Sequence, residues 1–151
     1  MLAENETGLE ETTLALSMSL APLLAESFAV QLHAFCAMAA FTLGLLQFAL
    51  PKGTTRHRFF GYAWVAILVT VAISSFWIHG IDMWNGFSPI HLISIYVLYS
   101  LPLAIFAARR GEIAAHKTHM RNIFIGGLVI AGVLSFLPGR IMLKVLIGEG
   151  G

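Results

Sequence analysis

Four stretches without a single Asp, Glu, Lys or Arg place the strongest constraint on how this chain folds. They cover residues 27–50, 59–81, 85–108 and 122–139. A helix needs about 20 mostly apolar residues to cross the hydrocarbon core of a bilayer. Backbone groups in lipid must be paired within the segment, so stretches of this length form helices and not isolated strands. The sequence therefore predicts an all-α integral membrane protein, a four-helix transmembrane bundle.

The composition agrees with a membrane location. Hydrophobic residues make up 58% of the chain and charged residues 11%, whereas soluble domains average about 45–50% and about 25%. The sequence contains no phosphate-binding glycine loop, no CxxC and no HExxH motif. We expect the lipid bilayer to be the main partner and expect no nucleic acid. The single cysteine, Cys36, excludes an intramolecular disulfide.

The first 26 residues differ from the rest of the chain. They hold five glutamates and no basic residue, so they lack the positively charged start of a secretory signal peptide. Their apolar part, TTLALSMSLAPLLA, contains Pro22 and is too short to span, which favours a helix lying at the interface. A disordered tail is the alternative. The predicted division is an acidic extension over 1–26, a transmembrane domain over 27–147 and a short tail over 148–151.

The basic residues predict the orientation in the membrane. Short translocated loops are depleted in Lys and Arg. The first and third loops carry seven such residues, so these loops should face the cytoplasm and both termini should lie outside. A bacterial inner membrane, crossed several times, is the expected location. The seven residues are Lys52, Arg56, Arg58, Arg109, Arg110, Lys117 and Arg121.

Aromatic residues are expected at both interfaces, as belts of Trp and Tyr are in other membrane proteins. Trp77 and Trp84 should then lie at the outer interface, and Tyr62 and Trp64 near the inner one.

Capping signals place the helix starts. Thr54 or Thr55 is a suitable N-cap for the second helix. Ser88 followed by Pro89 predicts the start of the third, because proline at the first helical position loses no hydrogen bond. The fourth should begin near Glu112.

Because consecutive helices alternate in direction, the histidines fall into two pairs. His33 and His91 should lie on the outer side, and His57 and His116 on the inner side. Two neutral imidazoles facing each other across a bundle can supply both axial ligands of a haem iron. The pattern therefore suggests haem b at one or both sites, with electron transfer across the membrane. Four glycines could allow a neighbouring backbone or a flat macrocycle to approach closely: Gly44, Gly61, Gly126 and Gly127.

Each histidine also has an alternative interpretation. His33 could make a structural hydrogen bond within the bundle, and His91 could lie at the outer interface. His57 lies between two arginines and could contact anionic headgroups. His116 and His119 are three residues apart, which is also the spacing of a solvated helical turn. Gln47 is expected to join helices by a hydrogen bond rather than to line a pathway.

Several segments together resemble a known family. They are HAFCAMAAFTLGLLQ (33–47), PKGTTRHRFFG (51–61), GFSPIHL (86–92), RRGEIAAHKTHMR (109–121), IGGLVIAG (125–132) and FLPGR (136–140). In this order they closely resemble the predicted bacterial membrane proteins grouped as domain of unknown function 2306 (DUF2306), over about residues 30–145. By this resemblance, the motif positions of the family fall on the following residues: His33, Gln47, Lys52, Gly53, His57, Arg58, Gly61, His91, His116, Met120, Gly126, Gly127, Pro138, Gly139 and Arg140.

The layout also resembles, at the level of fold, the histidine-bearing core of cytochrome b561-type and ferric-reductase-type membrane proteins. It departs from them in that His57 and His116 lie near the charged boundary. Our leading hypothesis is a small b-type haem protein that passes electrons from a quinol or a redox partner to an acceptor. The alternative is a cofactor-free accessory subunit of a larger membrane complex, docked through small-residue faces and a kink at Pro102. A proton-coupled carrier is a third, weaker reading.

Overall fold

The computed structural model describes residues 20–78 and 89–148. The described residues divide into two compact units, one over 28–132 and the other made of residues 20–27 with 133–148. No sequence feature described above predicts this division. Trp84 and most of the acidic extension lie outside the described residues, so the predictions made for them remain predictions.

Four helices in the described part are long and apolar enough to cross a membrane, as predicted. They are α3 (Phe28–Ala49), α4 (Thr55–Ser74) extended by the 3-10 turn η1 (Ser75–Trp77), α5 (Pro89–Arg109), and a fourth made of three consecutive pieces. The pieces are α6 (Ile113–Ile123), η2 (Phe124–Ile130) and α7 (Ala131–Ser135). The predicted all-α fold with four spanning helices is confirmed.

The helix starts follow the capping signals. Thr54 caps α4, with its Oγ accepting a hydrogen bond from the His57 backbone N–H at 3.1 Å. α5 begins at Pro89, and the fourth helix begins at Ile113 directly after Glu112. Gly53 and Gly111 have φ of +81° and +78° in the turns between helices, a region that glycine enters without steric cost.

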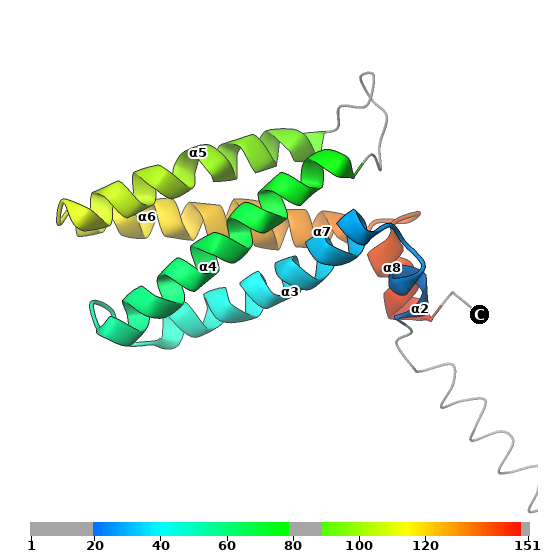
Figure 1. The fold of residues 1–151 in the computed structure, drawn as a ribbon, viewed down its shortest axis with the longest axis horizontal. Coiled ribbons are helices and arrows are strands. Elements are labelled where there is room, and N and C mark those ends of the chain that lie inside the picture. The colour runs from blue at the N-terminus through cyan, green and yellow to red at the C-terminus, as the bar shows by residue number, and fades with distance from the viewer. Residues whose placement is uncertain (1–19, 79–88, 149–151) are drawn as a thin grey trace, which may run out of the picture. The chain divides into compact units, whose positions relative to one another are not determined.

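Within the unit 28–132, the helices pack in ring order. α3 contacts α4, α4 contacts α5, α5 contacts α6, and η2 closes the ring against α3 (Figure 1). α3 and α5 are therefore diagonal to each other, as are α4 and the fourth helix. The core between them is apolar and consists of Ala40, Trp64, Leu68, Ala72, Val97, Leu101, Ala104, Ile123, Phe124 and Leu128.

Trp64 corrects one prediction. It was expected in the inner aromatic belt, but only 4% of it is exposed and it belongs to the core. Its indole Nε1–H donates to the Ala40 carbonyl at 2.8 Å, which satisfies the one polar group that burial would otherwise leave unpaired. Tyr62, in contrast, is exposed.

The fourth helix contains a feature that the sequence analysis missed. Its middle piece, η2, is a π-helix that includes both Gly126 and Gly127. π-Helical turns are rare and occur mostly as single wide turns within α-helices.

In the second unit, α2 (Ala21–Leu24) and α8 (Ile141–Ile147) pack against each other. Leu23 and Val145 are buried there. Pro22 lies in the first turn of α2, where its missing N–H costs nothing.

Candidate functional site

The four predicted ligands lie at the two ends of the unit 28–132. The first end is formed by the starts of α3 and α5 with the end of α4, and it carries His33 and His91. The second end is formed by the starts of α4 and α6 with the ends of α3 and α5, and it carries His57 and His116. Each predicted pair thus shares one end and comes from diagonal helices.

His33 is bound to the neighbouring helix. Its Nδ1 lies 3.0 Å from the Val71 carbonyl oxygen and 3.1 Å from Ser74 Oγ on α4. A carbonyl oxygen only accepts, so the imidazole Nδ1–H is the donor. Ser74 gives its own proton to the Val71 carbonyl at 3.0 Å, which leaves its oxygen free to accept from His33. In neutral His33, Nε2 therefore keeps its lone pair.

His91 is buried, with 3% of its surface exposed. Its ring stacks on that of Phe76, with centroids 5.5 Å apart and planes at 24°. Next to it, Ser75 and Ser94 share a hydrogen bond of 2.6 Å between their hydroxyl oxygens, which joins η1 to α5. The first end is therefore a polar layer of imidazoles and hydroxyls within apolar helices.

At the second end, His116 repeats the pattern of His33. Its Nδ1 lies 2.9 Å from the Ala104 carbonyl oxygen on α5. Nδ1–H again must donate, which leaves Nε2 unprotonated in the neutral ring. His116 and His57 are close enough for their charged forms to interact.

His57 has a different environment. Gln47 Nε2 on α3 donates to its backbone carbonyl at 2.8 Å, which confirms the prediction that Gln47 joins helices. Among the described residues, His57 Nδ1 and Gln47 Oε1 are the buried side-chain polar atoms that have no hydrogen-bond partner.

The glycines lie against protein side chains at three of their four positions. A Cβ at Gly44 would lie 2.6 Å from the Phe124 ring and 2.9 Å from Trp64 Nε1. A Cβ at Gly127 would meet Val97 at 2.8 Å, and one at Gly61 would meet Gln47 Nε2 at 3.1 Å. Only at Gly126 is there nothing within 4 Å among the described neighbours. At Gly44, Gly61 and Gly127, neighbouring protein side chains therefore lie where a Cβ would be.

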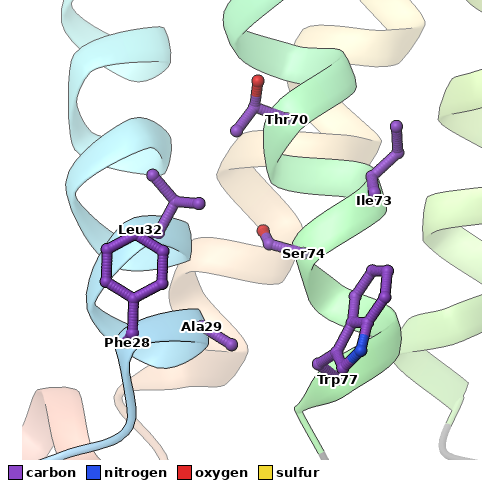
Figure 2. Close-up of a pocket in the computed structure, with 7 residues that line it drawn as sticks. All are labelled: Phe28, Ala29, Leu32, Thr70, Ile73, Ser74 and Trp77. Carbon is purple, nitrogen blue, oxygen red and sulfur yellow. The ribbon is translucent and has the colours of Figure 1, made fainter.

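A groove of about 400 Å³ lies between α3 and α4 at the first end (Figure 2). Ser74, the partner of His33, lines it, and the exposed side chains of Phe28 and Trp77 flank it. In Figure 2 the Ser74 hydroxyl points from α4 toward α3. The groove thus runs beside the hydrogen bond that holds His33.

Sequence reasoning missed the partners of these histidines. Ser74, Ser75 and Ser94 are small hydroxyl residues within apolar stretches, and nothing in the sequence says which helix each one faces. The carbonyls of Val71 and Ala104 have no side-chain signature at all. Among the described residues, no group of three or more His, Cys, Asp or Glu side chains is placed to hold a metal ion.

Comparison with known proteins identifies the family. The family model described as "Predicted membrane protein (DUF2306)" matches residues 30–147. The chain belongs to the DUF2306 family. No curated protein and no solved structure matches it. The family membership and the four apolar helices make this a multi-pass, membrane-embedded protein. The resemblance to cytochrome b561-type proteins is not supported by the comparisons.

Proposed function

We propose that this DUF2306 protein is a small b-type haem protein that moves electrons between the two ends of its helical unit. His33 with His91 would be the axial ligands at the first end, and His57 with His116 those at the second. A quinol or a redox protein is the proposed electron donor.

The observation that supports the proposal most directly is which imidazole nitrogen carries the proton in His33 and His116. An iron ligand must be a neutral imidazole nitrogen with a free lone pair, and ligating histidines usually donate their other N–H to a carbonyl or carboxylate. His33 and His116 each donate Nδ1–H to a backbone carbonyl on a neighbouring helix. One histidine at each end is therefore held with Nε2 as the available nitrogen.

The ring order of the helices supports the pairing. His33 and His91 come from α3 and α5, and His57 and His116 from α4 and α6. Diagonal helices are those whose side chains can face each other across the bundle, where such cofactor sites are built. Haem bound there would supply one-electron chemistry at a potential that depends on its ligands and burial.

A second candidate has an observation in its favour. The hydrogen bonds of His33 and His116 join α3 to α4 and α5 to α6. At Gly44, Gly61 and Gly127, protein side chains occupy the space that a Cβ would need. Both features stabilise the bundle without a cofactor, as expected for an accessory subunit of a larger membrane complex. In that case the histidines stabilise packing only.

An absorption spectrum separates the two. The full-length protein would be expressed with added haem precursor, purified in detergent and measured in oxidised and reduced forms. The haem proposal predicts the sharp bands of a low-spin, bis-histidine haem in the reduced-minus-oxidised spectrum. A colourless protein that purifies with a stoichiometric membrane-protein partner would instead establish the accessory subunit.

A further inference from the structure

A row of polar side chains covers the exposed side of α6. Lys117, Thr118, Arg121 and Asn122 are all exposed. They are spaced three or four residues apart, so they lie on one side of the helix. The other side of α6 faces the bundle, where His116 bonds to α5. The polar side of α6 therefore faces away from the bundle.

Two contacts with α5 define the depth of this polar side. His116 Nδ1 lies 2.9 Å from the Ala104 carbonyl oxygen. Further along the same helix, a Cβ at Gly127 would lie 2.8 Å from Val97. Arg121 lies between these two contacts, so its level on α5 is between Val97 and Ala104. This level is near the middle of α5.

The length of α5 places its middle in the hydrocarbon core. α5 has 21 residues, which span about 30 Å at about 1.5 Å per residue, and this length matches the hydrocarbon thickness of a bilayer. Arg109 and Arg110 mark the membrane boundary at the end of α5. Arg121 therefore lies about 15 Å inside that boundary, further than its side chain extends.

The length of the fourth helix leads to the same depth. This helix covers Ile113–Ser135. Its part without charged residues, 122–135, has about 14 residues and spans about 21 Å, whereas a crossing needs about 20 residues. With Arg121 at the boundary the helix would be too short to cross. Lys117 and Arg121, counted with the third loop from the sequence, thus lie within the crossing length.

A charged side chain that faces lipid at this depth is unfavourable, and charged residues within spans usually pair with another polar group. The acidic residues in the described part of the chain are Glu26 and Glu112. Glu26 precedes α3, and Glu112 directly precedes α6, about 13 Å from Arg121 along the helix. No described residue therefore supplies a carboxylate at the level of Arg121.

The charge and depth of this side favour one kind of partner. A lipid phosphate would have to leave the headgroup layer by about 15 Å to reach Arg121. A second copy packed through the same side would bring like charges together. A membrane helix with Asp or Glu near its middle supplies the opposite charge at the correct depth and can accept two hydrogen bonds from the guanidinium. Thr118 and Asn122 can add hydrogen bonds between the helices.

We infer that the polar side of α6, formed by Lys117, Thr118, Arg121 and Asn122, binds a transmembrane helix of a partner protein that carries a carboxylate near the middle of its span. The carboxylate pairs with the Arg121 guanidinium, and Lys117 lies one turn nearer the membrane boundary. The contact forms whether or not haem is bound.

Energy transfer in phosphatidylcholine vesicles tests the contact. The full-length protein carries a donor dye on a cysteine added after Gly151, with Cys36→Ser to remove the natural thiol. The probes are two acceptor-labelled polyleucine transmembrane peptides that differ only in one Glu or one Gln at the centre. Arg121→Gln removes the charge. Arg110→Gln is the matched control, because Arg110 is exposed on the same hairpin but lies at the end of α5.

We expect the wild type to bind the Glu peptide about tenfold more tightly than the Gln peptide, as a charge-assisted hydrogen bond between the helices would produce. Arg110→Gln should keep this preference, and Arg121→Gln should lose it. Arg121→Lys retains the charge and should keep part of the preference. It serves as the second variant if Arg121→Gln does not fold, which circular dichroism reports.

Equal binding of the two peptides by the wild type overturns the inference, and so does a preference that Arg121→Gln leaves unchanged. Two further measurements in the same vesicles identify the other partners. Without a preference for Glu, energy transfer between two labelled copies that requires Arg121 identifies a second copy. Transfer to dye-labelled phosphatidylglycerol that requires Arg121 identifies a lipid, and either result also overturns the inference. The colour of the samples reports haem separately, so failure of the proposed function is recognised independently.

Discussion

Gly44 and Gly126 show at the scale of single residues that the same amino acid can have opposite roles. Gly44 is buried where α3 meets Phe124 and Trp64, whereas Gly126 has open space around it. Both glycines were expected to make room for a neighbour, and only the structure separates them. The sequence around a glycine in an apolar helix does not indicate which side chains the glycine contacts.

The packing at Gly44 makes a quantitative prediction. Gly44→Ala should lower the free energy of unfolding by about 1–3 kcal/mol, because the new Cβ overlaps two rings that cannot both move away. Gly126→Ala is the matched control and should leave it unchanged or raise it by up to about 1 kcal/mol, since alanine loses less backbone entropy. Unfolding by sodium dodecyl sulfate in mixed micelles, followed by circular dichroism, measures both. Equal effects of the two substitutions would contradict the packing described for Gly44.

For the candidate ligands, the sequence nominates the histidines but does not indicate their hydrogen-bond partners. Histidine is costly within a membrane span, so His33 and His91 were evident candidates. The hydrogen bond from His33 to the Val71 carbonyl depends on how α3 is rotated against α4. Both helices are apolar on all faces, so no periodic pattern in the sequence specifies this rotation.

At the scale of elements, the sequence predicts where helices begin better than it predicts their internal geometry and packing. Pro89 at the start of α5 and Gly111 just before α6 are local signals that require no knowledge of the fold. The π-helix η2 and the burial of Trp64 depend on contacts between helices, and local sequence preference does not report these. The predicted kink at Pro102 remains a prediction, with the proline inside a continuous α5.

The capping of α4 can be tested directly. Thr54→Ala should reduce the free energy of unfolding by about 0.5–2 kcal/mol, because the His57 N–H loses its acceptor. Thr55→Ala removes the neighbouring hydroxyl and should have little effect. The same micelle titration gives both values. If Thr55→Ala were the more damaging, the cap would have been assigned to the wrong threonine.

At the scale of the whole molecule, membrane embedding was predicted from composition and is supported by the family and by the four apolar helices. The orientation of the protein in the membrane is predicted from the basic residues of its loops, and it remains a prediction. Fusion of alkaline phosphatase after Gly151 should give an active, exported enzyme, and fusion of green fluorescent protein there should give no fluorescence. Fusions after Arg110 should behave in the opposite way. The reverse result at both sites would invert the topology.

The central claim is that four histidines form two ligand pairs, and haem content in single variants tests it most directly. The wild type expressed with sufficient haem should bind about two haems per chain, and each of His33→Ala, His91→Ala, His57→Ala and His116→Ala should retain about one. Variants within a pair should leave the same residual spectrum, and variants from different pairs should leave different ones. A colourless wild-type protein, or haem content that none of the four substitutions alters, would contradict the account.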